Sequence, residues 1–192
     1  MMHSRSAAVN LSKLAPTMSR AFVNEDAPSG DVYIPPRAPL PHGAVNFVTP
    51  RGHRLLQEEL KAFEAEREKL KKGDPHSEDR NRALTVVRGK IKALEARLKG
   101  AKVVTPAEQP ADEVRFGARV TTRTVKGRKP GLERTFRIVG VDEADITTMR
   151  VGWIAPLARA LTGLKVGEQA SLPMGGVEET LEVTAIEYPD ET

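Results

Sequence analysis

Apolar residues recur at heptad spacing in two stretches of the chain, and a short polar turn separates the stretches. The spacings are 4, 3, 4 and 3 residues in the first stretch and 3, 4, 3 and 4 in the second. This seam is typical of helices that pack together as a coiled coil, and only Arg67 is out of character in it. The seam positions are Leu56, Leu60, Phe63, Arg67 and Leu70, then Leu84, Val87, Ile91, Leu94 and Leu98.

Capping residues indicate where both helices begin. Thr49 is a good N-cap and Pro50 suits a first helical turn, while residues 74–77 (Asp-Pro-His-Ser) precede the second helix. Two such helices joined by a tight turn fold back on each other. We therefore predict an antiparallel coiled-coil hairpin over residues 49–104 with its tip at 73–79. At about 1.5 Å per residue, 22 helical residues give an arm of roughly 33 Å.

The period changes to two in the C-terminal part of the chain, which is typical of β-strands. Glycines at 175–176 suit a hairpin turn, because positive φ angles cost glycine little. Residues 156–161 read as one short helix that proline opens and Gly163 closes. The predicted strands span residues 114–124, 132–139, 149–154 and 177–188. The fold class is α+β: a helical hairpin followed by an antiparallel sheet with one short helix on its face.

Two segments show neither the heptad spacing nor the period of two. Residues 1–48 are rich in proline, which predicts a disordered or extended N-terminal extension, with Met1 or Met18 as the true start. Residues 105–112 read as a linker, and residues 113–189 as the C-terminal domain. The extension is expected to be a plain tail, although it could drape over a partner through Tyr33-Ile34 or 46–48.

Composition excludes several kinds of chemistry. The chain has no cysteine, which removes disulfides, thiol catalysis and cysteine-bound metal. Its four histidines are scattered, so no metal site of its own is predicted. Aromatic residues make up 4% of the chain and Trp153 is the single tryptophan, so we expect no large aromatic-lined pocket. No apolar run approaches the ~18 residues that a membrane span needs.

Positive charge is concentrated on the predicted hairpin. Residues 51–100 hold 14 Lys and Arg against 9 Asp and Glu. This surplus is compatible with salt-sensitive contact to nucleic acid, but acidic residues are interleaved with it. No base-reading motif or aromatic stacking platform accompanies it.

Sequence motifs in a fixed order connect the two predicted parts to a known family. They are Thr49-Pro50-Arg51-Gly52, Ala101-Lys102-Val103-Val104, Phe136-Arg137-Ile138-Val139-Gly140, Asp142-Glu143-Ala144-Asp145, the run 156–167, Gly175-Gly176 and Ile186-Glu187-Tyr188. Over residues 48–188 the chain resembles the GreA/GreB transcription elongation factors. The extension from Met18 resembles that of a proteobacterial branch, which favours Met18 as the start. The resemblance implies that the C-terminal sheet domain is FKBP-like.

The resemblance also implies a partner and a site. In Gre factors the C-terminal domain grips RNA polymerase at the rim of its secondary channel. The coiled coil presents tip carboxylates to the catalytic Mg²⁺, where they help the polymerase to cleave backtracked RNA. Carried onto this sequence, the tip carboxylates acting in catalysis are Asp74 and Glu78. The implied polymerase-binding residues are Asp142, Glu143, Pro156 and Arg159.

The tip and the arm depart from the family pattern. The family's tip reads Gly-Asp, two residues, Glu-Asn; here Asp74 matches, Glu78 comes one residue later, and no asparagine follows it. The arm is also shorter, by about two turns on the first helix and one on the second, which withdraws the tip by roughly 10 Å. Two outcomes stay open: stimulation of RNA cleavage, or occupation of the channel in competition with other secondary-channel factors.

In either case the chain is expected to be an accessory factor and not an enzyme. It would need no cofactor of its own, only the polymerase Mg²⁺ if the tip is active, and would meet nascent RNA and DNA only indirectly. A bacterial cytoplasmic monomer without membrane contact is expected. A peptidyl-prolyl isomerase is the remote alternative, since it needs an aromatic-walled pocket. The C-terminal domain offers Phe116, Phe136, Trp153 and Tyr188 for one.

Overall fold

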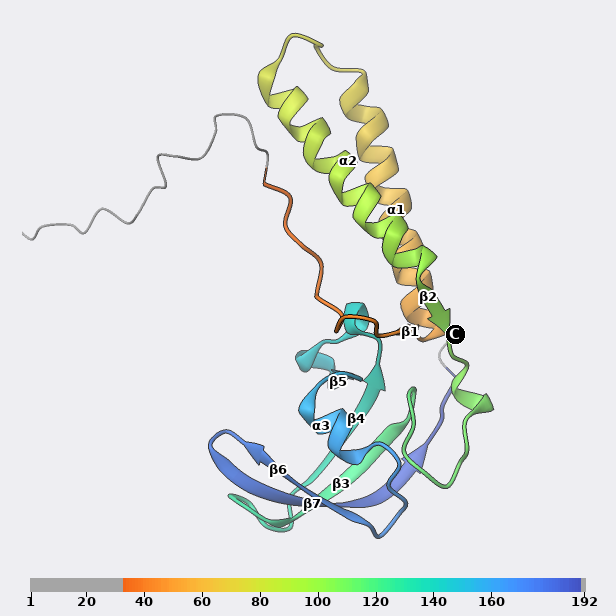
Figure 1. The fold of residues 1–192 in the computed structure, drawn as a ribbon, viewed down its shortest axis with the longest axis vertical. Helices are drawn as coiled ribbons and strands as arrows, with labels where there is room; N and C mark the ends of the chain where they lie inside the picture. Colours follow the sequence, from red (N-terminus) through yellow and green to blue (C-terminus); the bar gives the residue numbers. More distant parts are fainter. Residues whose placement is uncertain (1–32, 191–192) are drawn as a thin grey trace, which may run out of the picture. The chain divides into compact units, whose positions relative to one another are not determined.

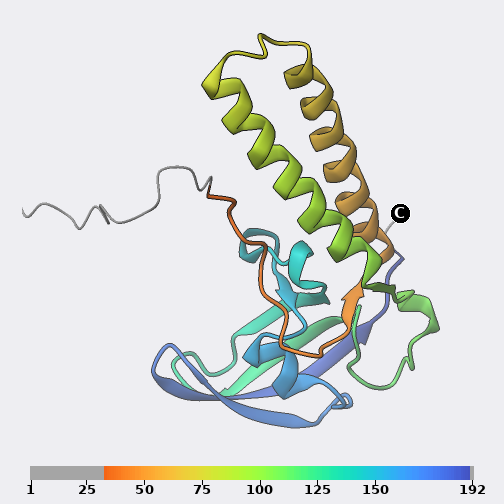
Figure 2. The same ribbon diagram turned by 45° about the horizontal axis from the view of Figure 1, so that its top comes forward.

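The computed structural model describes residues 33–190, all of which lie in one compact unit (Figures 1 and 2). The choice between Met1 and Met18 falls outside the described residues. A helical hairpin stands on a C-terminal β domain, and the segment 33–45 leads into the junction between them. Within residues 33–190, no helix is long and apolar enough to cross a membrane.

The hairpin consists of α1 (Pro50–Lys71) and α2 (Glu78–Lys99). The Thr49 hydroxyl accepts a hydrogen bond from the Gly52 amide and the Ser77 hydroxyl accepts one from the Arg80 amide, so both predicted starts are N-capped. The predicted seam faces inward. Its buried members are Leu56, Leu84, Val87, Ile91 and Leu94, and Leu60, Phe63 and Leu98 are partly buried.

A short parallel pair of strands closes the base of the hairpin, and the sequence did not predict it. β1 (Asn46–Val48) comes just before α1, and β2 (Ala101–Val103) comes just after α2. The Asn46 side-chain amide also donates to the carbonyl of Arg97, at 3.1 Å. The three residues at 46–48 are thus anchored within their own fold.

The C-terminal sheet has five strands in the order β5-β4-β3-β7-β6. Their bounds are β3 Arg119–Lys126, β4 Glu133–Val139, β5 Arg150–Gly152, β6 Gln169–Met174 and β7 Val177–Glu187. The expectation of a purely antiparallel sheet was wrong in one place, because β5 runs parallel to β4. The segment between β4 and β5 contains η2 (Val141–Glu143), η3 (Ile146–Thr148) and Met149, whose backbone is left-handed. This segment returns the chain toward the end of the sheet at which β4 begins, so that β5 runs in the same direction as β4.

One short helix, α3 (Pro156–Leu161), packs on this sheet as predicted. Ala155 supplies no side-chain cap, but Pro156 occupies the first turn, where it loses no hydrogen bond. Gly175 and Gly176 have positive φ angles of 58° and 83° between β6 and β7. The buried core of the domain consists of Val114, Ala118, Val120, Phe136, Ile138, Ala158, Leu161 and Val183.

Candidate functional site: the hairpin tip and the base of the arm

The tip is a compact turn built by short polar contacts. The Asp74 carboxylate accepts a hydrogen bond from the His76 amide at 2.9 Å, and the Asn81 side chain donates to the carbonyl of Pro75. Arg80 donates from Nε to the Leu70 carbonyl at 2.9 Å and from Nη2 to the carbonyl of Lys71. Arg80, which sequence analysis did not single out, therefore satisfies carbonyls at the end of α1.

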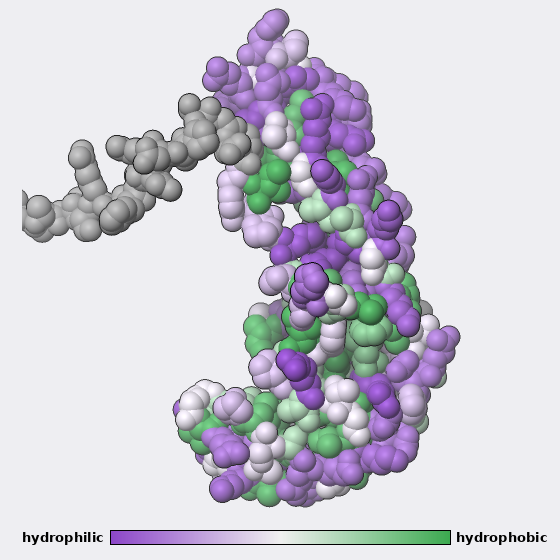
Figure 3. All heavy atoms as spheres, in the orientation of Figure 1, coloured by the Kyte–Doolittle hydropathy of each residue, from purple (hydrophilic) through white to green (hydrophobic). Residues whose placement is uncertain are grey.

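Both predicted tip carboxylates are exposed to solvent. Asp74 lies in the turn, and Glu78 is the first residue of α2, where its charge complements the helix dipole. The Glu78 side chain makes no hydrogen bond or ion pair within the described residues, so its carboxylate oxygens can accept a ligand. Hydrophilic residues cover this end of the hairpin in Figure 3. Among residues 33–190, no group of three or more His, Cys, Asp or Glu could hold a metal ion.

Removing the cap of α2 is expected to loosen the tip. Ser77→Ala should lower the free energy of unfolding by about 1 kcal/mol, because the Arg80 amide loses its acceptor. Ser77→Asp should keep the stability, since aspartate is an equally good N-cap. Urea unfolding followed by far-UV circular dichroism measures both variants. Equal losses in the two variants would show that the cap is not the source of the effect.

Asp142 and Glu143 lie at the junction between the hairpin and the β domain. The Glu143 side chain is 2% exposed and accepts hydrogen bonds from Thr49 Oγ1 at 2.5 Å, Arg51 Nη1 at 2.9 Å and Arg150 Nη1 at 2.8 Å. A Cβ on Gly52 would come 2.7 Å from its Oε2. The Glu143 carboxylate therefore lies against the N-terminal end of α1. It supplies the negative charge there, because the first turn of the helix has no acidic residue of its own.

Asp142 also pairs with basic side chains, in the segment before β1 and on α2. Its Oδ1 accepts hydrogen bonds from Arg37 Nε and Nη2, at 3.2 and 3.1 Å. Arg97 Nε lies 3.0 Å from its Oδ2 in an ion pair that lacks hydrogen-bond geometry. Both carboxylates thus join the arm to the β domain, and a partner would have to break these contacts to use them.

The other two predicted polymerase contacts lie on α3. Pro156 and Arg159 are both exposed there. The Arg159 side chain makes no contact with another polar or charged group among the described residues, so its guanidinium is available to a partner. The structure therefore separates the predicted residues into an exposed pair on α3 and a buried pair at the junction.

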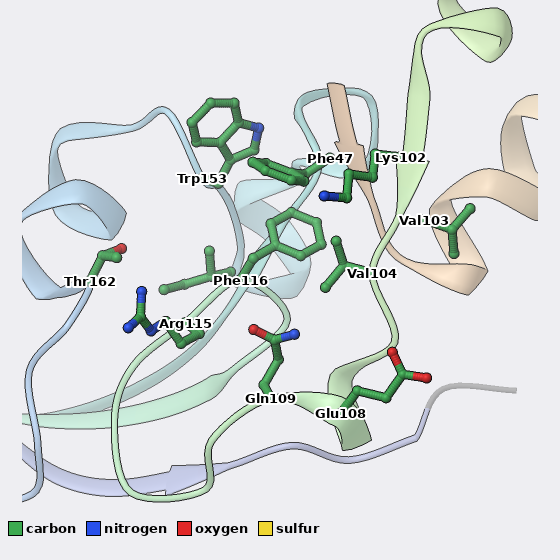
Figure 4. A pocket seen from close by; sticks show the side chains of 11 residues that line it. Phe47, Lys102, Val103, Val104, Glu108, Gln109, Arg115, Phe116, Trp153 and Thr162 are labelled. Carbon is green, nitrogen blue, oxygen red and sulfur yellow. The ribbon is translucent and has the colours of Figure 1, made fainter. Parts of the chain in front are cut away.

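A pocket beside the junction is lined by aromatic rings, although the composition led us to expect no large aromatic-lined pocket. Its volume is about 510 Å³, and three of its walls are the rings of Phe47, Phe116 and Trp153 (Figure 4). The Phe47 ring lies 5.5 Å from that of Trp153 and 5.7 Å from that of Phe116. The fold gathers scarce aromatic residues at one point, because Phe47 comes from β1 and the others from the β domain.

The structure defines a class of protein in which a mixed-sheet domain carries a two-helix arm with acidic residues at its tip. Residues 109–188 match the family model described as "Transcription elongation factor, GreA/GreB, C-term". Over this segment the chain is similar to the C-terminal part of GreA/GreB factors.

Individual curated relatives show the same similarity. The chain is 36% identical over 102 residues to the transcription elongation factor GreA of Acidiphilium cryptum (strain JF-5), which covers 53% of this chain and 63% of the relative. It is 38% identical over 104 residues to GreA of Francisella tularensis subsp. novicida (strain U112), covering 54% and 63%. The chain thus spans slightly less than two thirds of the length of these curated relatives.

Two solved structures are similar to this chain at lower sequence identity. The GreA/GreB factor of Nitrosomonas europaea is 20% identical with a TM-score of 0.37, covering 76% of this chain and 99% of that one. The GreA factor homolog 1 of Thermus thermophilus is 20% identical with a TM-score of 0.35, covering 75% and 99%. The similarity to GreA/GreB factors therefore rests on the sequence matches.

Proposed function

We propose that this chain is an accessory transcription factor that binds bacterial RNA polymerase at the rim of the secondary channel and extends its hairpin into that channel. The observation that carries the proposal is the GreA/GreB C-terminal match over residues 109–188, on a domain that bears a two-helix arm. Chemistry would then take place at the Mg²⁺ of the polymerase. The chain itself contributes docking and positioned carboxylates.

The exposed tip supports a role in cleavage of backtracked RNA. Asp74 and Glu78 are both open to solvent at the far end of the arm, and carboxylates are suitable ligands for a Mg²⁺ ion. Together they could help to hold a second metal ion and to activate water.

The length of the arm supports the second candidate, a channel occupant that does not stimulate cleavage. Each helix has 22 residues, so the arm extends roughly 33 Å at 1.5 Å per residue. Placing a reacting group even 1 Å away from its working position can lower a rate about 100-fold. An arm that stops short of the Mg²⁺ would still occupy the channel and compete with other factors there.

Binding to core RNA polymerase is the direct test of the proposal. The full chain is expected to bind at moderate salt, and to be displaced by a known secondary-channel factor, as measured by fluorescence anisotropy of the labelled protein. Absence of affinity for the polymerase under these conditions would overturn the proposed function in both of its forms.

Charge reversal on α3 should weaken that binding. Arg159→Glu is expected to raise the Kd about tenfold, equivalent to about 1.4 kcal/mol, because an anion replaces the exposed cation at the proposed contact. Lys126→Glu is the matched control, since Lys126 is also exposed and its side chain makes no hydrogen bond or ion pair within the described residues. Equal weakening by both variants would point to net charge instead of a contact through α3.

A further inference from the structure

Residues 33–45, here called the strap, run along the hairpin before the chain enters β1. They form no helix or strand, but contacts of Ile34, Arg37 and Ala38 with the rest of the protein hold them in place. The contacts involve both helices of the arm and the β domain (the strap is the orange trace in Figures 1 and 2). A tail without a structural role would not be expected to make specific contacts with the helices of the arm.

The first contact explains a glycine in the middle of α2. A Cβ at Gly89 would come 2.1 Å from Cδ1 and 2.9 Å from Cγ1 of Ile34. Glycine inside a helix is unfavourable relative to alanine, so its presence at an interior position calls for a reason. The close approach of Ile34 provides one, because a Cβ at position 89 would force the Ile34 side chain to move from its place.

The second set of contacts converges on Arg37, which connects three segments that are distant in sequence. Its Nη1 and Nη2 donate to the two oxygens of Glu59 on α1, at 2.9 and 3.0 Å. Its Nε and Nη2 also donate to Asp142 of the β domain. The paired geometry on Glu59 is the strong, directional form of an arginine–carboxylate contact. Hydrogen bonding to Glu59 raises the pKa of Arg37, and the charges of Glu59 and Asp142 add to this effect while burial opposes it.

Arg97 of α2 completes the cluster. Its Nε pairs with Asp142, while its Nη2 donates to the carbonyl of Ala38 in the strap. The side chain of Arg97 is 9% exposed and that of Asp142 is 7% exposed, so solvent screens this pair little. Strap, arm and β domain therefore meet at a single carboxylate.

We propose that the strap is a positioning element that fixes the angle between the hairpin and the β domain. Ile34 seats it on α2, and Arg37 connects α1 to Asp142. The proposal rests on the proposed function in one respect: a fixed angle would present the arm to the polymerase channel already oriented. Arg37 is a positioning residue in this scheme, since it acts through the arm and touches no reacting group.

The orientation of the arm can be measured in the free protein, without polymerase. The chain has no cysteine, so spin labels at Lys72→Cys near the tip and Glu133→Cys on β4 would report one distance. Arg37→Ala and Ile34→Ala are each expected to broaden the distance distribution in double electron–electron resonance. Arg88→Ala is the matched control on α2, because Arg88 is exposed and its side chain makes no hydrogen bond or ion pair within the described residues. Arg37→Lys should give an intermediate width, since an ammonium group cannot form the paired contact.

The same variants should lose affinity for the polymerase. If a released arm adopts the binding orientation in about one molecule in ten, the apparent Kd rises about tenfold. Far-UV circular dichroism should show that both helices remain, which separates loss of orientation from unfolding. Distance distributions that stay as narrow as those of the wild type would overturn the proposal. Broadened distributions with unchanged affinity would overturn the link between the orientation of the arm and polymerase binding. A wild-type chain that does not bind polymerase would instead overturn the proposed function, and the distance measurements would still decide the role of the strap.

Discussion

Replacing Glu143 by glutamine is expected to lower the free energy of unfolding by about 3 kcal/mol, the lower end of the range for breaking a buried ion pair. The variant keeps the shape of the side chain but removes the charge that Arg51 and Arg150 share. Arg150 is 15% exposed and would be left beside a neutral amide. Arg51 is 34% exposed, so water can compensate it in part, which is why the lower end applies.

The measurement is urea unfolding at neutral pH, followed by far-UV circular dichroism. Glu187→Gln is the matched control, because Glu187 pairs with Arg119 across the sheet while both side chains are about half exposed. An exposed pair of this kind is worth only ~0–1 kcal/mol. A loss in Glu143→Gln no larger than that in Glu187→Gln would show that the junction does not depend on this carboxylate.

The size of this effect follows from the position of Glu143 at the start of α1. Thr49 both caps the helix through the Gly52 amide and donates its own proton to Glu143, so cap and carboxylate form one network. The carboxylate also faces the positive end of the helix dipole. One residue of the β domain thus stabilises both the beginning of the arm and its attachment.

The hairpin could be predicted closely because its signals are local. The capping residues Thr49 and Ser77 fix the helix starts, and the heptad seam fixes the buried face. β1 and β2 were missed because three residues are too few to show a period of two. β6 was missed for a related reason: Pro173 interrupts it, and it lies at the edge of the sheet, where proline is tolerated.

The parallel pairing of β4 and β5 could not be predicted from the period of two, because that period does not indicate the direction of a strand. It depends on how η2, η3 and Met149 turn the chain between the two strands. Of the candidate site residues, Asp74, Glu78, Pro156 and Arg159 lie on exposed surfaces, and their roles stay predictions.

The junction escaped sequence analysis because its contacts join residues far apart in the chain. Arg37 and Asp142 are separated by 105 positions, and no motif relates them. Gly89 was the one local signal. A glycine at an interior helix position indicates close approach of another segment, but it does not identify that segment as Ile34.

Alanine at both Asp74 and Glu78 is expected to abolish stimulation of RNA cleavage in a stalled, backtracked elongation complex, with the Kd for polymerase unchanged within about twofold. The expected loss of rate is about 100-fold, the lower end of what positioned acid–base groups contribute. Both residues are exposed, and neither contacts the β domain, so docking should survive the change. Glu58→Ala/Glu66→Ala is the matched control, with the same loss of charge on exposed positions of α1.

The wild-type chain decides between the two forms of the proposed function in the same assay. Acceleration that disappears in the tip variant and persists in the α1 control would mean that the carboxylates reach the polymerase Mg²⁺ despite the 22-residue helices. Binding without acceleration, together with displacement of a cleavage-stimulating factor, would mean that the arm occupies the channel and stops short of the metal. An arm shorter by two turns ends roughly 10 Å earlier, and a carboxylate at that distance cannot ligate an ion that requires contacts of about 2 Å.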